Sequence, residues 1–388
     1  MKVIFIHSWI NYLNQPNSLF LSWEDAVSSD EFNIDSYDYY WSSPYKNFKN
    51  IAISKGHELG TVGDYPIGSA DVLWFIDIPH ARRDVTFLKT LVPKAKVVFQ
   101  MIESPVLYPY MMDYRNHDIF DVVITYNGQI CSKKQYHHYF LPFSFINYTP
   151  DGKVPIQHQP LPFELRKSVI MLNTNSKVGL FASPRSSPFF SPLPGGSVTK
   201  RGWYTSLKWV IEQERGELLS TRRKLAYYAD ENFPSLIDIY GQNWEGEKIG
   251  WLDTFTVKRK LKSAQGRLNL PKSRVLPNYR FCIAYENFRG NWGYISEKIF
   301  DCLYAGVVPV YLGDAEITKH VPPNCFVDAR NFKNERELLI YLRDCSESEW
   351  LYMLEAGEKF IRSESIKKFQ FEEFGNRMSE ILESIISI

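Results

Sequence analysis

The first half of the chain repeats short apolar runs at intervals that suit a parallel sheet. Each run is rich in Val, Ile and aromatic residues and lacks the alternation of a strand with one solvated face. Such runs are typical of parallel strands covered by helices, and the spacers are long enough for crossovers. The predicted strands of this half are Lys2–His7, Asp71–Ile76, Lys96–Met101 and Asp121–Tyr126.

The second half restarts this rhythm after residues 140–162, whose five prolines predict a linker. Together the two halves predict an α/β fold with two Rossmann-like domains facing across a cleft, where ligands bind beyond the carboxyl ends of the strands. The predicted strands here are Ser168–Leu172, Ser235–Tyr240, Arg280–Tyr285, Val307–Leu312 and Cys325–Asp328, and the predicted helices are Gly216–Ala229 and Ser296–Ala305.

These patterns divide the chain into three parts. We expect an N-terminal α/β domain over residues 1–162, a C-terminal α/β domain over residues 163–345, and a helical tail over residues 346–388 that packs back on the domains. Residues 182–202 are rich in Ser, Pro and Gly and are expected to form a mobile loop.

Composition argues against several classes of function. The 388 residues are 44% hydrophobic, and 45 Lys and Arg nearly balance 44 Asp and Glu, so we expect no nucleic-acid partner. No apolar stretch approaches the roughly 18 residues of a transmembrane helix, so no transmembrane segment is expected, and peripheral membrane contact is left open. The aromatic content of 15% permits sugar stacking without establishing it.

The cysteines and the first residues favour a cytoplasmic location. The five cysteines form no C-x-x-C pair, which disfavours a disulfide framework or a zinc ribbon, and we expect them to be buried. The apolar run Val3–Ile6 is too short for the hydrophobic core of a signal peptide. We therefore expect a reducing compartment.

Several familiar catalytic signatures are absent from the sequence. It contains no G-x-G-x-x-G after an early strand, no P-loop, no G-x-S-x-G and no H-E-x-x-H. It also contains no D-x-D, so we expect no metal site and no required divalent metal or other cofactor. The adjacent pair His137-His138 is expected at the surface, because neighbours on a strand or helix do not share a face.

One segment has the pattern of an anion-binding strand–loop–helix unit. A predicted strand ends at Glu286-Asn287, and the next helix opens near Ser296, which suits the N-cap position. Free N–H groups and the helix dipole attract phosphate there, and Lys298 adds a positive charge. Glu297 and Asn287 could hold sugar hydroxyls. The alternative is an ordinary βαβ unit with a surface Glu–Lys pair.

This segment resembles the donor-binding signature of the α-1,3-fucosyltransferases, glycosyltransferase family 10, and specifically their soluble bacterial-type members. Asn331 departs from the Asp that is usual in the family. The strong matches are Phe281–Asn287, Gly293–Lys298, Ala305–Gly313 and Pro322–Asp328. Weaker matches are Glu103-Ser104-Pro105, Phe120–Tyr126, Ser220–Leu225 and Asp238–Trp244.

The resemblance implies the GT-B fold and a reaction, with the acceptor bound by the domain of residues 1–162 and GDP-fucose by the domain of residues 163–345. It implies inverting transfer of L-fucose from GDP-β-L-fucose to a glycan hydroxyl, expected to be O3 of N-acetylglucosamine. The glutamate of the E-S-P element is the family's proposed general base, which here is Glu103. An arginine reaches the donor pyrophosphate in the family, and both Arg222 and Arg223 fit. The other donor-binding candidates are Asn287, Tyr294, Glu297 and Lys298.

Some alternatives stay open at this point. A transferase of the same architecture could use another nucleoside diphosphate sugar, or the chain could be a catalytically silent glycan-binding protein. Tyr240 and Trp244 are candidates for the walls of a nucleotide pocket or for core packing, and the basic residues of 258–274 are expected to lie in a solvated loop. The N-terminal candidates for stacking on acceptor sugars are Trp9, Tyr12, Trp23, Tyr39, Tyr40 and Trp41.

Overall fold

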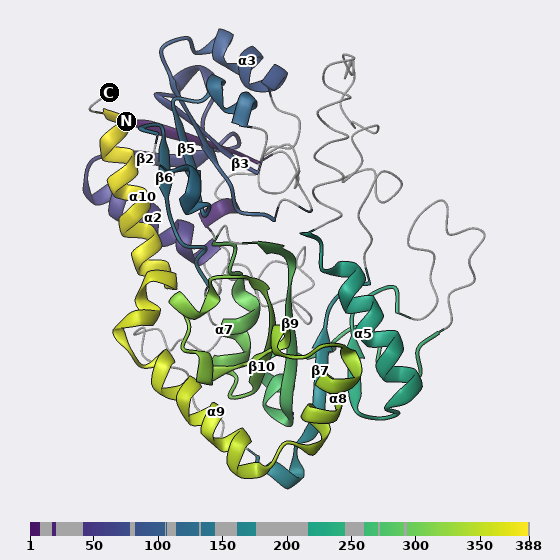
Figure 1. Ribbon diagram of the computed structural model, residues 1–388. Coiled ribbons are helices and arrows are strands. Elements are labelled where there is room, and N and C mark those ends of the chain that lie inside the picture. The colour runs from purple at the N-terminus through teal and green to yellow at the C-terminus, as the bar shows by residue number, and fades with distance from the viewer. Residues whose placement is uncertain are drawn as a thin grey trace, which may run out of the picture.

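The computed structural model contains two parallel β-sheets, one in each half of the chain (Figure 1). It describes residues 1–7, 18–20, 42–77, 82–104, 106, 114–131, 133–143, 161–175, 216–244, 260–270, 272–290 and 293–386. Most of the predicted linker 140–162, the whole of the predicted loop 182–202 and the six N-terminal stacking candidates lie outside these residues.

The N-terminal sheet has the strand order β2-β1-β3-β4-β5-β6, with every neighbouring pair parallel. The four predicted strands are confirmed, and β2 and β6 were not predicted. Both lie at edges of the sheet, where a strand has one neighbour and needs no continuous apolar run. The strands are β1 (Lys2–His7), β2 (Glu58–Thr61), β3 (Val72–Ile76), β4 (Lys96–Gln100), β5 (Val122–Thr125) and β6 (Tyr136–His138).

The expectation that His137-His138 lies at the surface is wrong. Both residues pair with β5 as part of β6 and are half-buried. Burial lowers the pKa of each imidazole, so both rings are neutral near pH 7.

The C-terminal sheet has the order β11-β10-β9-β7-β8, and its five strands are those predicted. Strand β9 is longer than expected and does not end at Glu286-Asn287. It continues to Gly290 because Gly290 pairs with Asp314 and Phe288 bridges to Glu217. The strands are β7 (Lys167–Leu172), β8 (Ile237–Tyr240), β9 (Tyr279–Gly290), β10 (Val308–Asp314) and β11 (Val327–Asp328).

Helices cover both sheets, as the continuous apolar strands require. In Figure 1, α7 lies on one side of the C-terminal sheet, and α5 and α8 lie together on the other. The apolar stripe of α5 meets that of α8 over strands β7 and β9, so the core of this domain forms between them. The helices are α2 (Ser42–Ser54), α3 (Arg82–Leu91), α5 (Leu219–Asn232), α6 (Lys272–Val275), α7 (Glu297–Tyr304), α8 (Glu335–Asp344), α9 (Glu347–Ile361) and α10 (Phe371–Ile386).

Trp244 belongs to this core. Its side chain is 1% exposed, and its indole nitrogen donates a hydrogen bond to the carbonyl of Asn173 at 2.5 Å. Of the two interpretations of Trp244, core packing is therefore confirmed. Tyr240 is half-buried at the end of β8.

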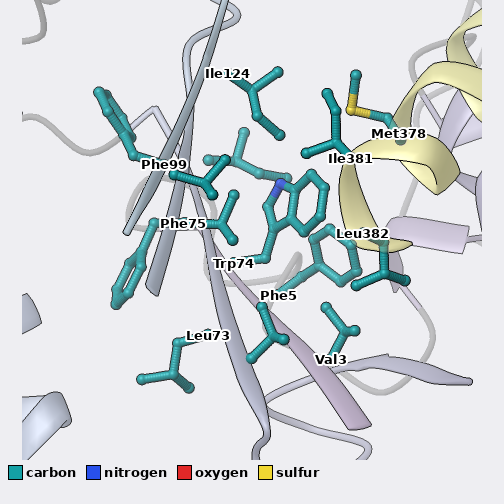
Figure 2. Close-up of a cluster of buried hydrophobic side chains, with 14 of the residues drawn as sticks. Val3, Phe5, Leu73, Trp74, Phe75, Phe99, Ile124, Met378, Ile381 and Leu382 are labelled. Carbon is teal, nitrogen blue, oxygen red and sulfur yellow. The ribbon is translucent and has the colours of Figure 1, made fainter. Parts of the chain in front are cut away.

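The last helix completes the core of the N-terminal sheet. Helix α10 runs from the C-terminal domain back to α2, and its residues Met378, Ile381 and Leu382 face Trp74 of β3 (Figure 2). All four side chains are at most 1% exposed, and burying each one stabilises the fold by roughly 1.5–3 kcal/mol. The two ends of the chain therefore share one hydrophobic core.

The five cysteines are free thiols, as predicted. Four of them are buried, whereas Cys131 is only half-buried. Within the described part of the chain, no helix combines the length and the apolar character needed to cross a membrane.

Candidate functional site

A buried carboxylate organises the place where β9 and α7 approach each other. Glu286 is 0% exposed, and its two oxygens accept hydrogen bonds from the amide and the hydroxyl of Ser296, at 2.8 and 2.7 Å. The ammonium of Lys298 lies 3.4 Å from the same carboxylate. Burial raises the pKa of Glu286, and Lys298 opposes that shift. Sequence reasoning gave Glu286 no role.

Gly313 of the neighbouring strand β10 explains how a glutamate fits there. A side chain on Gly313 would place its Cβ 2.5 Å from Cγ of Glu286 and 2.5 Å from the hydroxyl of Tyr311. Only glycine leaves room for both. The last glycine of the Ala305–Gly313 stretch is therefore a packing requirement of the buried glutamate.

The start of α7 gathers the charged residues that the sequence singled out. Ser296 is the N-cap, as predicted, and its hydroxyl also accepts a hydrogen bond from the Lys298 ammonium at 2.9 Å. Burial lowers the pKa of Lys298, but Glu297 and Glu286 outweigh burial and raise it. Burial raises the pKa of Glu297, but Lys298 and Lys272 outweigh it and lower that pKa to about 2. Lys298 is therefore a fixed cation at a helix N-terminus, suited to an anion.

The structure distinguishes the two arginine candidates on α5. Arg222 is 4% exposed, and its guanidinium donates to the carbonyl of Glu286 at 2.7 Å and to the side-chain oxygen of Asn287. Its Nε has no hydrogen-bond partner among the described residues. Burial lowers the pKa of Arg222 to about 10, so it remains charged at neutral pH. Arg223, the next residue, is half-buried.

Glu103 approaches this cluster from the N-terminal domain. It follows β4, is half-buried, and lies within electrostatic reach of both Lys298 and Glu297. Burial raises the pKa of Glu103, and Lys298 lowers it while Glu297 raises it. The predicted base and the predicted donor-binding residues therefore meet at the junction of the two domains.

A pair of tyrosines forms that junction. The rings of Tyr126, from the end of β5, and Tyr294 meet edge to face with centroids 5.1 Å apart. The hydroxyl of Tyr126 donates to the carbonyl of Glu103 at 2.9 Å. Gly293 has φ +82°, and a Cβ there would lie 2.7 Å from the carbonyl of Tyr126, so this contact also requires glycine.

Tyr294 is thus a buried junction residue, 5% exposed, within the core of the N-terminal domain. Its predicted part in donor binding stays a prediction. The further members of the site that sequence reasoning missed are Glu286, Asp77 and Tyr126. For Asp77 and Tyr126 a signal was present, since each is the polar residue that closes an apolar strand run.

The basic segment 258–274 is not simply a solvated loop. Leu261 is 0% exposed, and Ala264 forms a β-bridge with Ile239. Lys272 donates to Asp301 at 2.9 Å and belongs to the charge network of α7. The error arose because the few apolar residues of this segment, spread among many charges, follow neither a helical nor a strand period.

In the described part of the chain, no group of three or more His, Cys, Asp or Glu side chains could hold a metal ion. The expectation that the reaction needs no metal stays a prediction, because it rests on the missing D-x-D sequence.

Part of the chain is similar in sequence to known proteins. Residues 218–355 match the family model described as glycosyltransferase family 10 (fucosyltransferase), C-terminal part. The chain is 41% identical over 175 residues to α-(1,3)-fucosyltransferase 7 of Mus musculus, covering 43% of this chain and 36% of that protein. It is 35% identical over 72 residues to α-(1,3)-fucosyltransferase FucT of Helicobacter pylori, covering 19% of this chain and 15% of that protein. The chain therefore aligns with about a third or less of the length of these two relatives.

The architecture has a counterpart among solved structures. A crystal structure of an α1,3-fucosyltransferase with GDP superposes with a TM-score of 0.51 and 15% sequence identity, covering 99% of this chain and 90% of that one. This likeness shows that the two chains share the GT-B fold of two parallel α/β domains, as the sequence predicted.

Proposed function

We propose that this chain, whose residues 218–355 match the model of glycosyltransferase family 10, transfers L-fucose from GDP-β-L-fucose to a hydroxyl of an oligosaccharide or glycoconjugate. The observation that carries the proposal is the position of Glu103, whose carbonyl accepts the Tyr126 hydroxyl at the contact with Tyr294 and whose carboxyl lies within electrostatic reach of Lys298 and Glu297. An acid–base group facing a cationic diphosphate site is what glycosyl transfer requires.

The C-terminal half of the site supplies the donor pocket in this proposal. Arg222 and Lys298 are cations held in place by buried hydrogen bonds, and the N-terminus of α7 lies beside Lys298. When the bond between the fucose anomeric carbon and GDP breaks, the departing diphosphate gains negative charge. Preorganised donors stabilise that charge without reorganisation at the moment of reaction. Asn287 and Glu297 are proposed to bind sugar hydroxyls.

Glu103 supplies the base. Its carboxylate takes the proton of the acceptor hydroxyl, while the acceptor oxygen bonds to the anomeric carbon and GDP leaves from the opposite face. A single displacement inverts the configuration, so β-linked donor gives α-linked product. General-base assistance of this kind is worth about 10²–10⁴-fold in rate.

The finer assignments are part of the same proposal. We propose O3 of N-acetylglucosamine as the acceptor atom, no requirement for a divalent metal, and a cytoplasmic location. The first follows from the family, the second from the missing D-x-D sequence and the third from the cysteine pattern.

The test is a donor and acceptor panel with the full chain. GDP-fucose, GDP-mannose and UDP-sugars are each offered with a set of N-acetyllactosamine-type glycans, with and without a chelator, and products are identified by mass spectrometry and linkage analysis. We expect an α-1,3-fucosylated product from GDP-fucose alone, at a rate that the chelator leaves unchanged. Transfer only from a UDP-sugar would establish the rival transferase, and binding of glycan without any product would establish the glycan-binding protein.

A further inference from the structure

Asp77 is a buried aspartate in an unusual backbone conformation beside the loop that carries Glu103. It directly follows β3 and is 2% exposed, with φ +46°. Positive φ is uncommon for a residue with a side chain and persists where the surroundings hold it. Its own amide donates to the carbonyl of Gln100, the last residue of β4, at 3.0 Å. The carboxyl ends of the two neighbouring strands are thus tied together.

The carboxylate of Asp77 holds the backbone of the next turn. Its Oδ1 accepts the amide of Ile102 at 2.7 Å and the amide of Glu103 at 3.1 Å, and its Oδ2 also accepts the Glu103 amide at 3.1 Å. Two consecutive amides that leave the sheet therefore find one common acceptor. Such bonds to a carboxylate are stronger than neutral ones.

Two further bonds fix the carbonyl groups of the same turn. The hydroxyl of Tyr139 donates to the carbonyl of Met101 at 2.5 Å, and the hydroxyl of Tyr126 donates to the carbonyl of Glu103. The turn is therefore held on its amide side by Asp77 and on its carbonyl side by two tyrosines.

We infer that Asp77 is a positioning residue, whose carboxylate fixes the backbone at 102–103 so that the side chain of Glu103 is presented to the Lys298 cluster. The inference rests on the proposed function of Glu103 as the base. A base must lie within hydrogen-bond reach of the proton it takes, and a shift of about 1 Å can cost about 10²-fold in rate.

Two substitutions at Asp77 separate the effect of its hydrogen-bond acceptor from the effect of its positive φ. Asp77→Gly tolerates φ +46° and removes the acceptor, whereas Asp77→Asn tolerates the same φ and keeps one oxygen, which in the wild type receives both amides. Asp71→Asn is the matched control at the other end of the same strand run, where the carboxylate accepts the exposed amide of Lys2 at 2.7 Å.

The first measurement does not depend on activity. Amide hydrogen exchange at Ile102 and Glu103 should be about tenfold faster in Asp77→Gly than in wild type, and close to wild type in Asp77→Asn and Asp71→Asn. Unchanged exchange in Asp77→Gly overturns the inference even if the chain proves to be a fucosyltransferase. If exchange is faster in Asp77→Gly but the wild type transfers no fucose, the proposed function is refuted, and so is the positioning role of Asp77 in that reaction.

The second measurement is the kinetic consequence. In Asp77→Gly we expect kcat to fall about 10–100-fold while GDP affinity by calorimetry stays within threefold, with Asp77→Asn restoring most of kcat. A wild-type kcat in Asp77→Gly contradicts the inference. So does a parallel loss of kcat and GDP affinity, because a fold defect would affect both halves of the site.

Discussion

Glu103 and Glu286 are both glutamates near the carboxyl end of a central strand, and they differ in what surrounds the carboxylate. Glu286 is bound by the amide and hydroxyl of Ser296 and by Lys298. Glu103 has the neighbouring Ser104 amide and the more distant field of Lys298. A fully bonded carboxylate holds its surroundings in place, while one with spare acceptor capacity can take a proton. The comparison is consistent with a structural role for Glu286 and with the proposed role of Glu103 as the base.

The largest expected effect comes from Glu103→Gln. Removing the base should lower kcat by about 10²–10⁴-fold while GDP affinity changes less than threefold, because the donor cations remain in place. Initial rates and calorimetry measure the two quantities. The exposed pair residue Glu316 gives the control Glu316→Gln, which should behave as wild type. If Glu103→Gln kept wild-type turnover, Glu103 would not be the general base.

The same variant makes a pH prediction. Burial raises the folded-state pKa of Glu103, so ionising it costs stability as pH rises through that pKa. Glu103→Gln should therefore have a higher Tm than wild type at pH 7, and the difference should vanish at acidic pH, where Glu103 is protonated in both states. In wild type, kcat/KM should fall as pH drops through this raised pKa, above the ordinary value of a glutamate. A Tm difference that grows on acidification would contradict the prediction.

A smaller effect is expected from Lys298→Ala. Loss of one charge-assisted bond to the diphosphate, worth about 1.5–3 kcal/mol, should weaken GDP binding roughly 10–150-fold. Calorimetry with GDP is the measurement, and Lys319→Ala is the control, since Lys319 is an exposed lysine paired with Glu316 at 2.6 Å. Equal GDP affinity in Lys298→Ala and wild type would place the diphosphate elsewhere.

The smallest change in activity, with a clear cost in stability, is expected from Glu286→Gln. Gln has one accepting oxygen, whereas the carboxylate accepts both the amide and the hydroxyl of Ser296. One buried hydrogen bond is lost, so the unfolding free energy should fall by about 1–3 kcal/mol. Denaturant unfolding measures this, with the exposed pair Glu58–Lys2 giving Glu58→Gln as a near-neutral control. The prediction would be contradicted if Glu286→Gln were as stable as wild type and lost as much turnover as Glu103→Gln, because Glu286 would then act in the reaction.

Sequence predicted most of what is local. The strands with continuous apolar runs, the N-cap Ser296 and the segment around β9 and α7 could all be found, because each depends on residues close together in the chain. The burial of Arg222 rather than Arg223 could also have been predicted. Arg222 lies three, four and seven residues before Leu225, Ala226 and Ala229, on the buried stripe of α5.

What sequence could not supply is contact between distant residues. The bond between Asp77 and the Glu103 amide joins positions 26 residues apart on neighbouring strands, and the ring contact of Tyr126 with Tyr294 joins the two domains. No periodicity in the chain encodes these distances, because they follow from strand order and from how the domains meet. The role of Glu286 was hidden for the same reason, since Gly313 on another strand makes room for it.

The helix that returns to the N-terminal sheet has a consequence for how the chain is made. The strands of that sheet are complete at residue 138, but Met378, Ile381 and Leu382 emerge from the ribosome about 240 residues later. At about 5–20 residues per second this delay is roughly ten to fifty seconds. Throughout that interval the indole of Trp74 and its neighbours lack their final cover. The hydrophobic core of the N-terminal sheet therefore cannot be completed until α10 has been synthesised.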